Sequence, residues 1–222
     1  MSLVHGLHDG KSMNLSSGIL NQIFEDRFVF EEGAYRAYVT DEKTNIDQKD
    51  IQKMKRQNTI RKEYTFKGKG LHSGRPVTMT LKPAPADTGI RFVRTDIGPD
   101  ATVDALAENV SSTARSTTIS SGEATVGTIE HLLSALTGLG VDNVLVEIDS
   151  AEVPILDGSA KPYVDAIAPD GLAEQDAPRH YVTLKEKVEY KNPSTGAFLT
   201  IEPADTFSYD ITIDFNSKVL GV

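Results

Sequence analysis

The sequence predicts an α+β fold: an antiparallel sheet packed with helices as a two-layer sandwich, in tandem-repeat domains of which the second is truncated. Val77, Met79 and Leu81 alternate with polar residues, as in a strand that buries one face. Two segments with helical patterning, residues 129–139 and 160–168, interrupt a chain otherwise composed of short strands and turns. A strand-and-turn motif also occurs twice, which indicates a duplicated domain.

The strands are predicted from period-two alternation and from the turn residues between them. Gly98 and Pro99 end the second strand, and Ser121 with Gly122 forms the turn of a hairpin. The last strand is an apolar run that begins soon after Gly140. In chain order, the predicted strands are residues 77–82, 90–93, 117–119, 124–126 and 144–148.

The first helix is predicted over residues 129–139, with Thr128 as its N-cap and Gly140 at its end. Its apolar residues recur at i, i+3, i+4 and i+7 and form one stripe towards the core. This stripe consists of Ile129, Leu132, Leu133 and Leu136. At about 100° per residue, Glu130 and His131 fall on the opposite side of the helix.

The second helix is predicted over residues 160–168, with Ser159 as its N-cap and Pro162 in the first turn, where a missing N–H is tolerated. Asp157 lies in the turn that leads into this helix, and capping explains its presence sufficiently. Its carboxylate could instead orient an imidazole that binds a metal. Both interpretations remain open at the level of the residues.

Changes in sequence patterning along the chain suggest its domain boundaries. Residues 1–53 carry no recognisable motif and are expected to be a leader or an appended segment. The patterning becomes regular from Met54, so residues 54–178 are predicted to form the first α+β domain. Residues 179–222 are predicted to be the opening strands of a truncated second α+β domain.

The composition excludes several classes of protein. Of the 222 residues, 32 are Asp or Glu and 23 are Lys or Arg, so the formal net charge is −9. We therefore expect no nucleic-acid partner and no binding to anionic membranes. The chain has no cysteine, so a metal would be held by His and carboxylates. The sequence shows neither an apolar run of ~18 residues nor a signal pattern, so we expect no transmembrane segment and a cytoplasmic location.

The adjacent Glu130 and His131 are the first candidates for catalysis. They lie in the first turn of the predicted helix, where unpaired N–H groups and the macrodipole place partial positive charge. That field favours an ionised carboxylate and a neutral imidazole, which are the forms required of a general base and of a metal ligand. The alternative is a solvent-exposed Glu–His pair without chemistry.

The second candidate is the turn Gly70-Leu71-His72-Ser73-Gly74. Its glycines permit positive φ angles and close backbone approach. It is not a phosphate-binding loop, because no helix follows it and no Gly-Lys-Ser/Thr sequence closes it. A tight β-turn that merely exposes Leu71 and His72 is the alternative interpretation.

The internal repeat joins residues 79–88 to residues 199–206, which share the pattern of an alternating strand followed by Pro, Ala, Asp and Thr. An alternating strand follows each copy, from Ile90 in the first and from Tyr209 to Phe215 in the second. The helix of the first copy would have its equivalent beyond Val222. We therefore expect the chain to be cut within its second domain.

Several motifs in order closely resemble UDP-3-O-acyl-N-acetylglucosamine deacetylase, the zinc enzyme of the committed step of lipid A biosynthesis. The resemblance extends from about Met54 to Phe215 with nearly gap-free spacing. The motifs are Gly70-Leu71-His72-Ser73-Gly74, Pro83-Ala84-Pro85-Ala86-Asp87-Thr88-Gly89, Thr128-Ile129-Glu130-His131, Gly138-Leu139-Gly140-Val141-Asp142-Asn143 and Ile155-Leu156-Asp157-Gly158-Ser159-Ala160.

The resemblance implies a fold of two similar α+β domains with the active site between them. It implies Zn²⁺ held by two His and one Asp, with His131 as the first zinc ligand and Glu130 as the general base. Leu71 and His72 would lie at the edge facing the substrate, UDP-3-O-acyl-N-acetylglucosamine. The remaining zinc ligands are expected from the missing second domain, so the 222-residue chain by itself is expected to be inactive.

Two other functions are compatible with the residues. One is a non-catalytic α+β binding or structural module that uses the Gly-Leu-His turn to contact a partner. The other is a different enzyme on a similar fold, such as a small-molecule kinase, although no Gly-rich loop is followed by a helix here.

Overall fold

The structure is a computed structural model that describes residues 29–31, 34–38, 55–179, 186–204, 208 and 210–212. Contacts between Cα atoms divide the chain into two compact units. The larger consists mainly of Ile46–Ser112 and Ser116–Arg179, and the other of Ser2–Asn45, Thr113–Arg115 and His180–Val222. Each unit is described by itself below.

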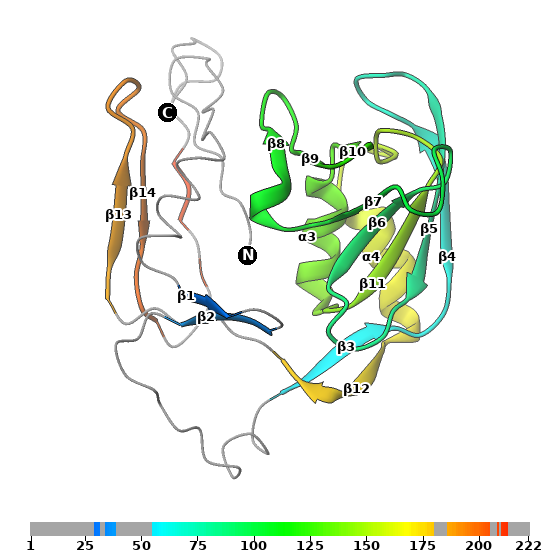
Figure 1. Cartoon of the computed structure of the whole chain (residues 1–222), viewed down its shortest axis with the longest axis horizontal. Helices are drawn as coiled ribbons and strands as arrows, with labels where there is room; N and C mark the ends of the chain where they lie inside the picture. The colour runs from blue at the N-terminus through cyan, green and yellow to red at the C-terminus, as the bar shows by residue number, and fades with distance from the viewer. Residues whose placement is uncertain are drawn as a thin grey trace. The chain divides into compact units, whose positions relative to one another are not determined.

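The larger unit is built around a five-stranded sheet with the order β4-β5-β11-β6-β7 (Figure 1). All neighbouring strands of this sheet are antiparallel except β11 and β6, which are parallel. The expected fold class, α+β with mainly antiparallel strands, is confirmed. The five strands are β4 (Tyr64–Lys69), β5 (Pro76–Pro83), β6 (Ile90–Arg94), β7 (Thr102–Asp104) and β11 (Val144–Ile148).

Two smaller sheets complete this unit. One has the order β10-β9-β8, and the other pairs β12 with β3. The predicted hairpin is confirmed, since Ser121 pairs with Ala124 across a turn formed by Gly122 and Glu123. These strands are β3 (Arg56–Ile60), β8 (Val110–Ser112), β9 (Thr118–Ser121), β10 (Ala124–Gly127) and β12 (Leu172–Pro178).

One face of the five-stranded sheet forms the core. Val77, Met79 and Leu81 are buried as the alternation predicts, and β11 buries Val144, Val146 and Ile148 in the same way. Helices α3 (Glu130–Leu139) and α4 (Lys161–Ile167) contact each other and contribute to the same core (Figure 1). Short 3₁₀ segments, Ala107–Asn109 and Ala168–Asp170, precede β8 and follow α4.

The predicted phase of the first helix is correct in its main part. Ile129, Leu132 and Leu136 are buried, whereas Leu133 is half-buried and packs against the edge of the core. Ala135, which the stripe did not include, is buried instead. The helix ends as predicted at Gly140, whose φ of 84° is left-handed and whose N–H donates to the Leu136 carbonyl.

The predicted N-caps need correction. Helix α3 begins at Glu130 with Ile129 in the N-cap position, and no side chain caps it. Thr128 is no N-cap, because its hydroxyl donates to Glu152 instead. In α4 the N-cap is Ala160, although the Ser159 hydroxyl accepts a hydrogen bond from the Lys161 N–H nearby.

The two ends of the described stretch 55–179 meet. Strands β3 and β12 are antiparallel, and the Arg179 N–H donates to the Lys55 carbonyl at 2.8 Å. The first and last residues of this stretch are therefore neighbours.

The second unit contains two antiparallel pairs among the described residues. Strand β1 (Val29–Glu31) pairs with β2 (Ala34–Tyr38), and β13 (Val188–Lys191) pairs with β14 (Phe198–Ile201). Strand β14 carries the second copy of the repeat, and it forms a hairpin with the preceding strand as β5 does in the first copy. The alternating strand expected from Tyr209 to Phe215 falls largely outside the described residues, as does most of the expected leader, residues 1–53.

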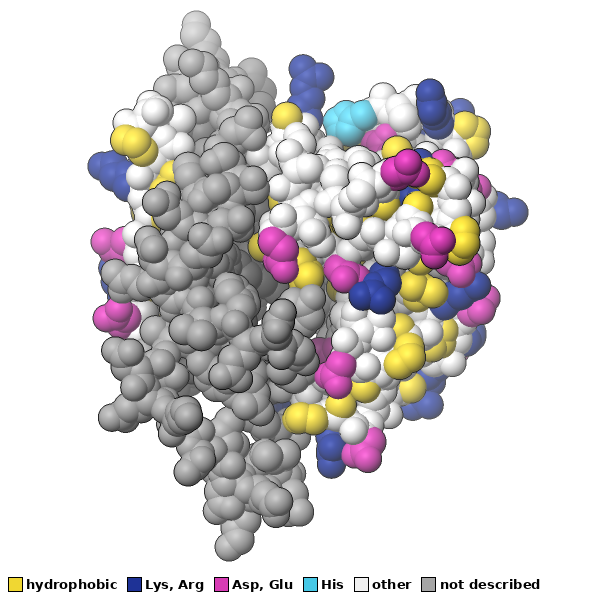
Figure 2. Space-filling view, in the orientation of Figure 1, with side chains coloured by type: hydrophobic (Ala, Val, Ile, Leu, Met, Phe, Trp, Pro, Cys, Tyr) yellow, Lys and Arg dark blue, Asp and Glu magenta, His cyan; other side chains and the backbone are white. Residues whose placement is uncertain are grey.

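The surface of the larger unit carries charges of both signs. On the face shown in Figure 2, acidic, basic and apolar side chains are interspersed rather than gathered by type. Within the described ranges, no helix has both the length and the apolar character needed to cross a membrane.

Candidate functional site

Glu130 and His131 form the first turn of helix α3, and both side chains are half-buried. The Thr117 N–H donates to Glu130 Oε2 at 3.1 Å, which fixes one carboxylate oxygen and leaves Oε1 without a hydrogen bond in the described part of the chain. The His131 imidazole makes no hydrogen bond to any described residue. Among the described residues, the pair thus presents one carboxylate oxygen and one imidazole without a hydrogen-bond partner.

The Gly-Leu-His turn connects β4 to β5. It is closed by two backbone hydrogen bonds of 3.0 Å, from the Gly70 N–H to the Arg75 carbonyl and from the Gly74 N–H to the Gly70 carbonyl. The Leu71 side chain is 56% exposed, and His72 is also exposed. The turn therefore presents these two side chains to solvent, as the sequence predicts.

Glu152 joins the turn to the start of helix α3. Its Oε1 accepts hydrogen bonds from the His72 N–H at 2.8 Å and from the Thr128 hydroxyl at 3.0 Å. Its Oε2 accepts from the Ser73 N–H at 2.9 Å. One carboxylate thus contacts the turn that carries Leu71 and the segment that leads directly into Glu130.

This carboxylate is buried, since only 6% of Glu152 is exposed. Burial disfavours its charged form, but the N–H groups and hydroxyls that it accepts from outweigh that effect. Together they lower the pKa of Glu152 to about 2. The side chain is therefore ionised at every pH at which the protein would function.

Asp157 lies apart from this cluster of contacts. It is exposed, and its Oδ1 accepts hydrogen bonds from the N–H and the hydroxyl of Ser159 at 2.9 and 2.8 Å. The hydroxyl and N–H of Ser159 hold the pKa of the Asp157 carboxyl below its usual value. No hydrogen bond links Asp157 to His131 within the described residues, so its contacts are those of a turn before a helix.

The site residues therefore fall into two groups. Through Glu152 and Thr128, the structure connects the turn of Leu71 and His72 to the helix of Glu130 and His131. It does not connect Asp157 to either of them. The sequence places Glu152 at the start of the candidate segment that leads to Asp157, but sequence reasoning gave Glu152 itself no role. Charged residues are rarely buried unless they are paired, so its burial could not be expected from the local pattern.

The described residues do not hold a metal site by themselves. Within them, no group of three or more His, Asp or Glu side chains is arranged to bind a metal ion. A tetrahedral zinc site needs three protein ligands as well as a water molecule. His131 fits the role of one such ligand, because its imidazole is unengaged and lies beside a carboxylate.

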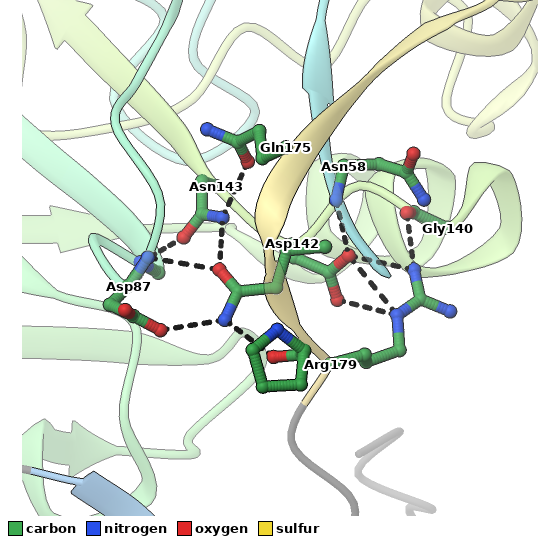
Figure 3. A network of polar contacts seen from close by, with 10 residues as sticks. Asn58, Asp87, Gly140, Asp142, Asn143, Gln175 and Arg179 are labelled. Carbon is green, nitrogen blue, oxygen red and sulfur yellow. Dashed lines mark hydrogen bonds and ion pairs between the residues drawn. The ribbon is translucent and has the colours of Figure 1, made fainter. Parts of the chain in front are cut away.

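The opposite end of helix α3 is held by a separate polar network (Figure 3). Asn143 is only 1% exposed, and its side-chain amide donates to Gln57 Oε1 at 2.7 Å and to Gln175 Oε1 at 2.8 Å. Its Oδ1 accepts from the Gly89 N–H at 2.8 Å. Both N–H donors of this amide and its oxygen are thus engaged by neighbouring strands and loops.

Arg179 forms the charged part of the same network. Its Nη2 donates to the Gly140 carbonyl at 2.5 Å and to Asp142 Oδ2 at 2.8 Å (Figure 3). The same carboxylate oxygen accepts from the Asn58 N–H at 2.8 Å. A cation at the C-terminal end of a helix is favoured by the helix dipole, so this contact is suited to stabilising α3.

Comparison with known proteins identifies the family. The family model described as "LpxC: UDP-3-O-acyl N-acetylglycosamine deacetylase" matches residues 57–222, which is most of the chain. The chain belongs to this family. The recognition made from the motifs is thereby confirmed.

Curated relatives agree with this deacetylase family. The chain is 47% identical over 167 residues to the UDP-3-O-acyl-N-acetylglucosamine deacetylase of Hahella chejuensis, covering 75% of this chain and 55% of the relative. It is also 47% identical to the deacetylase of the same name from Pseudomonas entomophila, covering 75% and 54%. It is 45% identical over 168 residues to the bifunctional enzyme LpxC/FabZ of Porphyromonas gingivalis, covering 76% and 36%. The chain thus spans about half the length of the curated deacetylases that it matches.

Proposed function

We propose that the protein acts as a UDP-3-O-acyl-N-acetylglucosamine deacetylase of lipid A biosynthesis. In this proposal it is a zinc-dependent amidohydrolase of the cytoplasm, and this chain contributes Glu130 and His131 to the active site. Membership of the deacetylase family supports the reaction and the substrate. The observation that carries the assignment of residues is the Glu130 carboxylate, held by one oxygen beside an unengaged imidazole at a helix start.

Glu130 acts as the general base. Because Oε2 accepts the Thr117 N–H, Oε1 is the oxygen available to take a proton from the attacking water. The Thr117 contact also restricts rotation of the carboxylate, so that Oε1 points in one direction when substrate binds.

His131 supplies one ligand to zinc, and the other ligands come from outside the described residues. When bound in such a site, zinc polarises the amide carbonyl and lowers the pKa of a coordinated water molecule. His131 must be neutral to bind the metal.

Leu71 and His72 contact the substrate in this proposal. Both are exposed at a turn that Glu152 connects to the start of α3, which supports a role at the edge of the site. For Asp157, the sequence leaves two roles open. One is to orient a metal-bound imidazole, and the other is to cap the turn before α4. Its hydrogen bonds with Ser159 support the capping role at least as well as the first.

The test compares three substitutions and one control in the full-length gene product that carries this chain. Glu130→Gln should keep the metal and slow deacetylation by about 10²–10⁴-fold, as expected for a lost general base. His131→Ala should lose the metal, as read by metal analysis, together with activity. His72→Ala should keep the metal and raise KM. Glu147→Gln, which removes a carboxylate that pairs with Lys82 on β5, is the matched control and should retain the wild-type rate.

Each result discriminates between the interpretations. A His131→Ala protein that kept both metal and rate would remove His131 from the zinc site. A wild-type full-length protein that bound neither zinc nor substrate would favour the non-catalytic binding module. Because no three His, Asp or Glu side chains within the described residues are arranged to bind a metal ion, the 222-residue chain alone should bind zinc weakly and release no acetate.

A further inference from the structure

We propose that Glu152 is a positioning residue of the deacetylation reaction, because its carboxylate holds the Leu71–His72 turn against the start of helix α3. The inference rests on the proposed function, since it assigns to Glu152 the task of fixing the position of the substrate-facing turn relative to Glu130 and His131. Sequence reasoning assigned no role to Glu152 itself.

The first argument is the sharing of one oxygen. Glu152 Oε1 accepts both the His72 N–H and the Thr128 hydroxyl, while Oε2 accepts the Ser73 N–H. A carboxylate can accept all three hydrogen bonds at once, because its two oxygens offer about four acceptor sites. The turn and the segment before α3 therefore cannot shift relative to each other without loss of a hydrogen bond.

The second argument is that Glu152 itself is fixed by the backbone. The Gly127 N–H donates to the Ala151 carbonyl at 2.9 Å, and the Val153 N–H donates to the Gly127 carbonyl at 3.1 Å. These two bonds enclose Glu152 and form a parallel bridge directly beside Gly127. The carboxylate is thus anchored next to the residue that precedes Thr128.

The third argument is the close fit of the turn. A Cβ atom at Gly70 would lie 2.2 Å from Glu152 Oε2, so a side chain at this position would displace the carboxylate. Glycine at position 70 allows the turn to close directly on Glu152. The requirement for glycine here comes from this approach and not from an unusual φ angle.

The fourth argument is the backbone conformation of Thr128. Its φ is 58°, in the left-handed region that β-branched residues rarely adopt. Such a conformation persists when surrounding contacts determine it, and the hydrogen bond to Glu152 is one of those contacts. Because Glu130 lies two residues further on, relaxation of Thr128 would move the start of the helix.

The contacts of Glu152 are unlike those of an ordinary ion pair. Within the described ranges, no Lys or Arg pairs with it, and its charge is balanced by N–H and hydroxyl donors alone. Substitution by Gln conserves the size of the side chain but turns an amide NH₂ group towards one of these donors. Glu152→Gln should therefore disrupt the alignment without creating a cavity.

The test uses the full-length gene product with Glu152→Gln, Thr128→Val and the double variant. Each single substitution should lower kcat/KM by about 10–10²-fold, as expected for a small misplacement of reacting groups. The double variant should be no slower than the slower single variant, because both substitutions break the same connection. Thr128→Ser keeps the hydroxyl and should restore most of the rate, while Glu147→Gln serves as the matched control.

A second readout is independent of activity. Amide hydrogen exchange at His72 and Ser73 should accelerate at least tenfold in Glu152→Gln, while exchange in the core strand β11 stays unchanged. Exchange that accelerated throughout would indicate general destabilisation and overturn the proposal. So would a Glu152→Gln protein with wild-type kcat/KM, or strictly additive losses in the double variant. An inactive wild-type protein would instead contradict the proposed function, and exchange at His72 and Ser73 would still decide whether Glu152 holds the turn.

Discussion

The two ends of helix α3 are held in opposite ways. At the C-terminal end, Asn143, Asp142 and Arg179 direct their polar groups at neighbouring strands and loops, and their charges are paired. At the N-terminal end, the buried Glu152 carboxylate accepts a hydrogen bond from the Thr128 hydroxyl. Within the described residues, Glu130 Oε1 and the His131 imidazole make no hydrogen bond. The difference supports the proposal that the N-terminal end presents reactive groups, whereas the C-terminal end contributes to stability.

The largest effect is expected when the side-chain amide of Asn143 is removed, because it lies at the centre of the polar network at the C-terminal end of α3. Asn143→Ala should lower the free energy of unfolding by about 3–4 kcal/mol, because three hydrogen bonds are lost and buried partners are left unsatisfied. Urea unfolding of the chain measures this change. A loss below about 1 kcal/mol would mean that water or neighbouring groups replace the amide, and that this end of α3 is not specially stabilised.

The loss of folding stability at low pH tests the contacts at the N-terminal end of α3. The pKa of Glu152 is about 2 in the folded protein, below the ordinary 4.5, so the unfolded chain takes up this proton first as the pH falls. The stabilisation is therefore complete above about pH 5 and is lost as the pH falls towards 2. It amounts to about 3 kcal/mol at neutral pH.

The measurement compares unfolding of the wild-type chain and of Glu152→Gln between pH 2 and pH 7. The difference in stability should be largest at neutral pH and should shrink as the pH falls towards 2. Other carboxylates with lowered pKa values, such as Asp96 and Asp170, titrate in both proteins and cancel in the difference. A difference independent of pH would show that Glu152 carries no lowered pKa.

A smaller effect is expected at the ion pair of the C-terminal end. Arg179→Met should cost about 1–2 kcal/mol, because the pair with Asp142 is about one-fifth exposed and water partly replaces the lost contacts. Asp142→Asn should cost a similar amount, and the double variant should cost less than the sum of the two. Additive costs in urea unfolding would show that the two side chains act independently.

The sequence carries enough information for the core but not for the connections of the site. Alternation in β5 and the apolar stripe of α3 predict burial correctly, because each depends on residues a few positions apart. Glu152 escapes such reasoning because its partners lie 80, 79 and 24 positions away. The same contact explains why Thr128 was wrongly predicted as an N-cap, since its hydroxyl has a partner from outside the helix.

The parallel pairing of β6 with β11 could not be predicted from the alternation of apolar residues either. Both strands read as short apolar segments, and their direction relative to each other depends on how the intervening hairpin and helix cross the sheet. Glu130 and His131 were found through their place at a helix start, and their roles remain predictions of the family resemblance.

The meeting of Lys55 and Arg179 has a consequence for how this unit can be used in a longer protein. Because the first and last residues of the stretch 55–179 are hydrogen-bonded neighbours, this stretch can be inserted into a longer chain, or copied within it, with little strain on its surroundings. Duplication of such a unit needs only a short joint between copies. The same geometry should allow a circular permutant in which a short linker joins residue 179 to residue 55 and new termini open in an exposed turn such as Gly122-Glu123.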